Sequence, residues 1–81
     1  MDGTIYSRLT ALLDRRVTIT EEFFNEGRWQ DLEPEQRLLL DVTDGGIWFA
    51  AVPSGYFACF EGKIRIKSMQ VGEEVFYQRR E

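Results

Sequence analysis

Short stretches of β-branched and aromatic residues recur along this chain, separated by three turns that contain glycine. The turns are Asn25-Glu26-Gly27, Asp44-Gly45-Gly46 and Glu61-Gly62. Glycine adopts the positive φ that tight hairpins require, so this spacing predicts three successive antiparallel hairpins. Their strands are expected at residues 17–24 with 28–32, 37–43 with 47–52, and 56–60 with 63–69.

Residues 4–14 carry a helical pattern ahead of the first strand. Ile5, Leu9, Leu12 and Leu13 fall at i, i+4, i+7 and i+8, which places them on one face of an α-helix. A helix this short is marginal on its own in water. We therefore expect its apolar face to pack against the sheet.

Two segments allow a helix as well as strands. Over residues 20–32, Gly27 in the middle and the broken apolar spacing favour a hairpin. Over residues 34–41, a proline followed by Glu-Gln is typical of a first helical turn, so a short helix competes closely with a strand. On a strand, one face would carry Leu38, Leu40 and Val42. We favour the strand.

The C-terminal half gives clearer strand signals. Residues 47–52 are apolar on both faces, as in a central strand that is covered on both sides, and 56–60 follow the same pattern. A last short strand is expected at 73–77. The polar tail at 78–81 is expected to fray.

These elements predict one α+β domain over residues 1–81. Its N-terminal helix packs on a curved antiparallel β-meander of five or six strands. The chain contains no family motif, but its layout resembles that of small barrels of the SH3-like and Sm-like kinds. A chain of 81 residues has room for one domain with a thin core, which its eleven aromatic residues help to fill.

Composition narrows the class of protein. The net charge of −4 argues against a general nucleic-acid binder. With no histidine and one cysteine, the chain lacks the parts of Ser-His, Cys-His and zinc sites, so we expect no enzyme activity, no metal and no cofactor. Cys59 cannot form an intrachain disulfide, and no apolar run approaches the roughly 20 residues of a membrane span. We expect a cytoplasmic protein without a membrane contact.

Basic and apolar residues alternate near the third turn. The alternation predicts Ile64 and Ile66 facing inward and Lys63, Arg65 and Lys67 facing outward. Three cations on one strand face could follow a phosphate backbone, as in small nucleic-acid-binding barrels. A solvated outer face that protects an edge strand is the competing interpretation, and the net charge favours it.

Acidic residues gather in the first half of the chain, opposed in that segment only by Arg28 and Arg37. The carboxylates are Glu21, Glu22, Glu26, Asp31, Glu33, Glu35, Asp41 and Asp44. They could form a surface that docks on a basic partner or occupies the channel of a nucleic-acid enzyme. Small acidic inhibitors that occur in phages and mobile elements act in this way. Ordinary solubility charge is the favoured interpretation.

The aromatic residues exceed what one face of a small sheet can bury. Trp48 and Phe49 face opposite sides of their strand, so one side needs the helix or another chain to cover it. We therefore expect a non-enzymatic module that docks onto another protein or onto its own copy. The docking residues that we expect are Trp48, Tyr56, Phe57, Glu33 and Glu35. The acidic inhibitor and the nucleic-acid-binding barrel are the alternatives.

Overall fold

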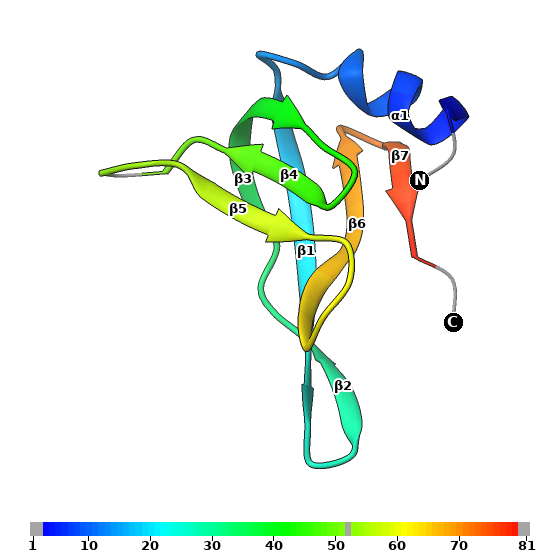
Figure 1. Ribbon diagram of the computed structural model, residues 1–81, viewed down its shortest axis with the longest axis vertical. Helices are drawn as coiled ribbons and strands as arrows, with labels where there is room; N and C mark the ends of the chain where they lie inside the picture. Colours follow the sequence, from blue (N-terminus) through cyan, green and yellow to red (C-terminus); the bar gives the residue numbers. More distant parts are fainter. Residues whose placement is uncertain (1–2, 52, 80–81) are drawn as a thin grey trace.

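The computed structural model describes residues 3–51 and 53–79. Its elements are α1 (Gly3–Thr10), β1 (Arg16–Asn25), β2 (Arg28–Asp31), β3 (Glu35–Val42), β4 (Gly46–Phe49), β5 (Tyr56–Cys59), β6 (Ile64–Val71) and β7 (Glu74–Gln78). The strands pair antiparallel in the order β5-β4-β3-β1-β6-β7, with β2 also paired to β1 (Figure 1). The predicted helix and antiparallel sheet are thus confirmed as one short helix and a small open sheet.

The first two hairpins form as predicted. β1 and β2 are joined by a two-residue loop, Glu26 and Gly27, whose φ angles of 53° and 79° are left-handed. That loop geometry matches the right-handed twist of the two strands. β3 and β4 pair across the second turn. Both segments for which a helix competed, 20–32 and 34–41, therefore hold strands.

The prediction of a third hairpin, at Glu61-Gly62, is wrong. β5 pairs with β4, whereas β6 pairs with β1, so Glu61-Gly62 connects strands that are not hydrogen-bonded neighbours. The register on β1 explains the choice, because it sets Ile19 opposite Met69 and buries both side chains in the core. The last hairpin is β6–β7 instead, and it turns at Gly72 with φ 58°.

The helix is shorter than predicted. α1 ends at Thr10, and residues 11–14 form tight turns in which Leu12 N–H donates to the Leu9 carbonyl. These turns lead the chain to β1 while Leu9 and Leu12 stay fully buried. Leu13, expected on the same face, is 39% exposed. The Ile5 side chain lies outside the described part.

The core lies between two layers that share β3. β4 and β5 cross over β1 and β6 in Figure 1, while α1 packs against β3 and β7. The buried apolar residues come from the helix, its following turn and five strands or their ends. They are Leu9, Leu12, Val17, Ile19, Leu39, Val42, Ile47, Phe49, Ala58, Phe60, Ile66 and Met69.

A bulge changes which leucines of β3 face the core. The β3–β4 register shifts between Leu39 and Asp41. Leu39 is fully buried and Leu40 is 45% exposed, so the predicted inner face of Leu38, Leu40 and Val42 is wrong. An extra residue in one strand reverses the alternation beyond it, which returns Val42 to the core.

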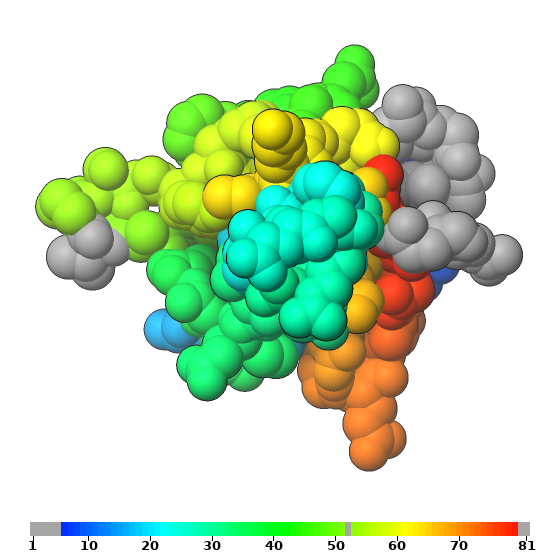
Figure 2. Space-filling view, turned by 90° about the horizontal axis from the view of Figure 1, so that it is seen from below, coloured from blue at the N-terminus to red at the C-terminus, as the bar shows by residue number. Residues whose placement is uncertain are grey.

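β2 and β3 lie on the same edge of β1, one after the other. Thr18 and Ile19 pair with both β3 and β6, whereas Glu22 and Phe23 pair with both β2 and β6. Residues 32–34 fill the interval, where Pro34 has no N–H to donate to a neighbouring strand. The β1–β2 hairpin consequently projects beyond the rest of the sheet (Figures 1 and 2).

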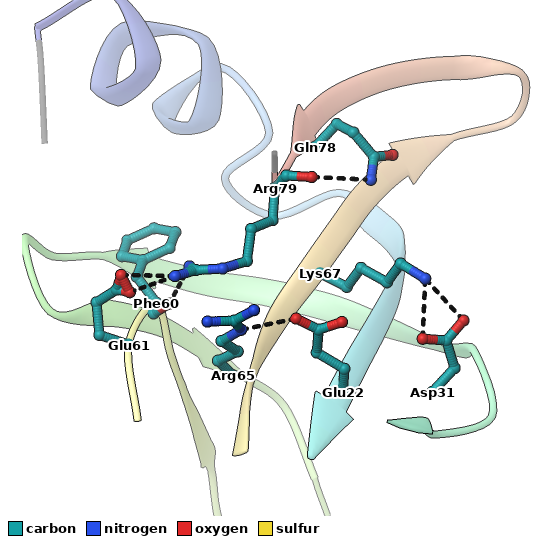
Figure 3. A network of polar contacts seen from close by, with 8 residues as sticks. All are labelled: Glu22, Asp31, Phe60, Glu61, Arg65, Lys67, Gln78 and Arg79. Carbon is teal, nitrogen blue, oxygen red and sulfur yellow. Dashed lines mark hydrogen bonds and ion pairs between the residues drawn. The ribbon is translucent and has the colours of Figure 1, made fainter. Parts of the chain in front are cut away.

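The C-terminal segment is held further along than expected. β7 continues to Gln78, and the Arg79 guanidinium bonds the Phe60 carbonyl and the Glu61 carboxylate at 2.8 and 2.7 Å (Figure 3). The expected fraying is therefore wrong for residues 78–79. Residues 80–81 lie outside the described part.

The second turn does not use glycine for a positive φ. Neither Gly45 nor Gly46 has one; Gly46 is needed because the chain passes so close to β5. A Cβ on Gly46 would lie 2.1 Å from the Ala58 carbonyl oxygen, whereas one on Gly45 would meet only ordinary contact at 3.9 Å.

We expect Gly46→Ala to destabilise the protein by about 1–3 kcal/mol, because β4 and β5 must move apart to admit the methyl group. Gly45→Ala is the matched control. It should be neutral or stabilising by up to about 1 kcal/mol, since it only restricts the unfolded chain. Urea unfolding of the two variants measures the difference, and equal stabilities would contradict the close approach.

Candidate functional site

An open cleft with a volume of about 360 Å³ lies where the chain passes from β2 to β3. Its lining comes from β1, the 32–34 segment, β3 and β5. The residues are Ile19, Glu21, Leu32, Glu33, Glu35, Arg37 and Tyr56. The cleft therefore brings together three of the five expected docking residues, Glu33, Glu35 and Tyr56.

Strand alternation explains why polar groups line this cleft. Ile19 and Glu21 are two residues apart on β1, so the face that buries Ile19 continues outward to Glu21. Across the β1–β3 ladder, Glu35 lies opposite Ile19 and Arg37 opposite Val17. The cleft is thus the polar end of the same face that forms the core.

A hydrogen bond between Tyr56 and Glu21 closes the cleft on the β5 side. The Tyr56 hydroxyl donates to the Glu21 carboxylate, with Oη to Oε distances of 2.8 and 3.0 Å. Burial raises the pKa of the Glu21 carboxyl above its ordinary 4.5, although the Tyr56 bond acts in the opposite direction. Burial and the bond to Glu21 together raise the pKa of Tyr56 from 10.0 to about 12.

The charges in the cleft are unbalanced. Arg37 is the one cation of the lining, and its Nε donates to Glu35 Oε2 at 2.7 Å. Glu33 makes no hydrogen bond or ion pair within residues 3–51 and 53–79. When ionised, three carboxylates therefore face one guanidinium that is already engaged.

The other two expected docking residues form an aromatic pair outside the cleft. Trp48 and Phe57 are directly opposite on β4 and β5, with ring centroids 4.9 Å apart. Trp48 is 42% exposed, and its ring lies against Gly55. Because neighbouring residues of a strand point to opposite faces, Tyr56 reaches the cleft while Phe57 joins the outer face.

The basic residues of β6 do not share one solvated face. Arg65 is only 8% exposed, and its Nε lies 2.6 Å from Glu22 Oε2 (Figure 3). Its guanidinium also lies over the Trp29 ring, 3.5 Å from the ring centroid. Arg65 is covered by Glu22 and Trp29 instead of solvated, and Ile64 is 53% exposed, so the predicted solvated Arg65 and inward Ile64 are wrong. The β1–β2 hairpin is the reason, because it supplies Glu22 and Trp29 as a cover over Arg65.

The two lysines differ as well. Lys67 Nζ forms an ion pair with the carboxylate of Asp31 on β2, at 2.8 Å (Figure 3). Lys63 is exposed at the end of the connection from β5, immediately before β6, where its carbonyl accepts the Phe24 N–H. The three cations thus lie in three different environments.

The acidic segment is likewise divided among separate contacts. Glu22 is buried with Arg65, Asp31 is paired with Lys67, and Glu35 is paired with Arg37. Sequence reasoning named Glu21 only within the general acidic surface and Arg37 only as a charge opposing it, and assigned neither to a specific site. Alternation from Val17 through Ile19 could have placed Glu21 on the core face, but nothing in the sequence indicates its contact with Tyr56.

Comparison with protein families, curated proteins and solved structures gave no match to this chain. The described residues contain no group of three or more acidic or cysteine side chains that could hold a metal ion. No helix in the described part is long and apolar enough to cross a membrane.

We expect Glu22→Gln to destabilise the protein by about 3 kcal/mol or more, because it leaves the buried Arg65 without its carboxylate. Asp31→Asn is the matched control. It removes the carboxylate of an exposed pair with Lys67 and should cost less than about 1 kcal/mol. Urea unfolding followed by tryptophan fluorescence compares them, and similar losses would show that burial adds nothing to the Glu22–Arg65 pair.

We expect one tyrosinate absorbance step near pH 12 that disappears in Tyr56→Phe. Glu21→Gln should lower that midpoint toward 10 without reaching it, because the charge is removed while burial remains. Between about pH 10 and 12 the folded state keeps this proton and the unfolded chain loses it, so stability falls as the pH rises through that window. A midpoint that Glu21→Gln does not move would argue against the contact.

Proposed function

We propose that this chain is a non-enzymatic protein-interaction module. It docks onto another protein, or onto its own copy, and the Trp48–Phe57 pair anchors the contact. The observation that carries the proposal is the exposure of Trp48 in a fixed position on the outer face of β4.

The surroundings of the pair favour a role as an anchor. Phe57 packs against Trp48 with its ring tilted by 49°, and β4 and β5 approach each other closely at Gly46. A large aromatic side chain that is already fixed loses little conformational freedom on binding, which is why Trp is favoured at the centre of interfaces. Leu40, 45% exposed on neighbouring β3, adds apolar surface on the same layer.

The alternatives from the sequence receive less support. A nucleic-acid-binding face would need the cations of β6, but Arg65 is buried against Glu22 and Lys67 is paired with Asp31. An inhibitor that imitates a phosphate backbone would need a continuous row of carboxylates, whereas three of the eight in the acidic segment, Glu22, Asp31 and Glu35, are engaged in separate ion pairs. Neither alternative has an observation of its own in its favour.

We also propose that the sheet is an incompletely closed barrel of the SH3-like or Sm-like layout. Across the sheet the strands lie in the order β6-β1-β3-β4-β5, and this sheet curves back on itself. Arg79, at the end of β7, donates a hydrogen bond to the Phe60 carbonyl just after β5. With a single cysteine the chain cannot form the intrachain disulfides that are typical of small secreted domains, so we propose a cytoplasmic location.

We expect Trp48→Ala to weaken association by about 2 kcal/mol or more, a loss of roughly 30-fold in affinity. Affinity capture from the host, followed by titration of the captured protein, measures binding to a partner. Sedimentation equilibrium measures self-association.

Ile64→Ala is the matched control, because it removes an exposed apolar side chain from β6, away from the Trp48–Phe57 pair. It should leave association unchanged. Circular dichroism and the urea midpoint must show that both variants fold. A folded Trp48→Ala variant that associates like the wild type would refute the anchor.

A further inference from the structure

The cleft at the polar end of the core face has a shape suited to one side chain. Its volume of about 360 Å³ is at the small end of the range for ligand pockets, which is roughly 300–1,000 Å³. Ile19, Leu32 and the Tyr56 ring give it apolar walls. Such walls accommodate the aliphatic part of a long side chain whose head is polar.

Its polar groups are almost all acceptors. The one cation, Arg37, is hydrogen-bonded to Glu35, and the Tyr56 hydroxyl already donates its hydrogen bond to Glu21. Apart from the Arg37 N–H groups that do not bond Glu35, the remaining polar groups are the carboxylate oxygens of Glu21 and Glu33 and the lone pairs of the Tyr56 oxygen. A ligand that fits this set brings several donors and a positive charge.

We propose that the cleft receives one arginine side chain of the partner protein. A guanidinium offers five N–H donors in a plane and no acceptor, which matches a lining in which three carboxylates outnumber one guanidinium. It also pairs with carboxylates through two parallel bonds and stacks on aromatic rings, and Tyr56 provides such a ring. The inference rests on the proposed function, since a partner protein supplies the arginine.

The arrangement assigns separate tasks to the residues of the cleft. Glu33 provides the carboxylate that has no contact within the described residues, so its charge is available to the incoming guanidinium. Glu21 and Tyr56 form the far wall, fixed to each other by their hydrogen bond.

The test titrates the isotope-labelled protein with Nα-acetyl-arginine methylamide and follows backbone amide signals by NMR. We expect millimolar binding, as for a ligand of this size, with shifts concentrated at Glu21, Leu32, Glu33 and Tyr56. The citrulline analogue has the same shape without the charge and should bind at least about tenfold more weakly. Equal binding of the two probes, or shifts spread away from the cleft, would overturn the inference.

Glu33→Gln and Glu26→Gln form a matched pair of variants, because both remove one exposed negative charge and only Glu33 lines the cleft. Glu33→Gln should weaken the arginine probe about three- to tenfold, and Glu26→Gln by less than about twofold. Equal weakening would mean that only the net charge of the protein matters, which would refute a specific site.

Trp48→Ala separates this inference from the proposed function, since it leaves the cleft intact. The probe should bind this variant as it binds the wild type. If the probe fails to bind the wild type while Trp48→Ala still loses the partner, the cleft inference fails and the proposed function stands. If the probe binds but Trp48→Ala keeps the partner, the anchor fails instead.

Discussion

β1 hydrogen-bonds to three other strands, and that pairing places both the cleft and the buried Glu22–Arg65 pair. One edge of β1 meets β3 and then β2, and the other edge meets β6. Its inward residues run from Val17 and Ile19 in the core to Glu21 in the cleft, while Glu22 on the opposite face holds the buried Arg65. A strand with partners on both edges cannot slide, because a shift of one residue would exchange its two faces.

The connection between β2 and β3 leaves a cleft beside β1. Residues 32–34 leave the edge of β1 incompletely paired, since Pro34 has no donor. Only the Leu32 N–H continues the pairing, to the Glu21 carbonyl at 2.8 Å. The core face is therefore open to solvent at this point, and Tyr56 from the other layer reaches Glu21 across it. The same hydrogen bond holds the two layers together and shapes the far wall of the cleft.

The sequence predicted the local elements well and their partners less well. The Glu26–Gly27 loop and the alternation of 17–20 are local signals, so the first strands and their hairpin followed from them. The assignment of β6 failed because a turn signal such as Glu61-Gly62 does not say which strand comes to lie beside the next one. The leucines of β3 were misassigned because one bulged residue, invisible in the sequence, reverses the alternation. For the candidate site, Glu33, Glu35 and Tyr56 were named among the docking residues, but their meeting in one cleft, apart from Trp48 and Phe57, depends on contacts across the fold.

By itself the sequence determined an α+β chain rich in strands, with an excess of aromatic and acidic side chains, because periodicity and composition act within a few residues. Only the tertiary structure decided which of those side chains are available. Arg65 is buried beneath Glu22 and Trp29 and is not available to a partner. Trp48 remains exposed, because the helix packs on β3 and β7 and not over β4. The reason is physical: burial and ion pairing depend on neighbours that are distant along the chain, and only the pairing of strands brings them together.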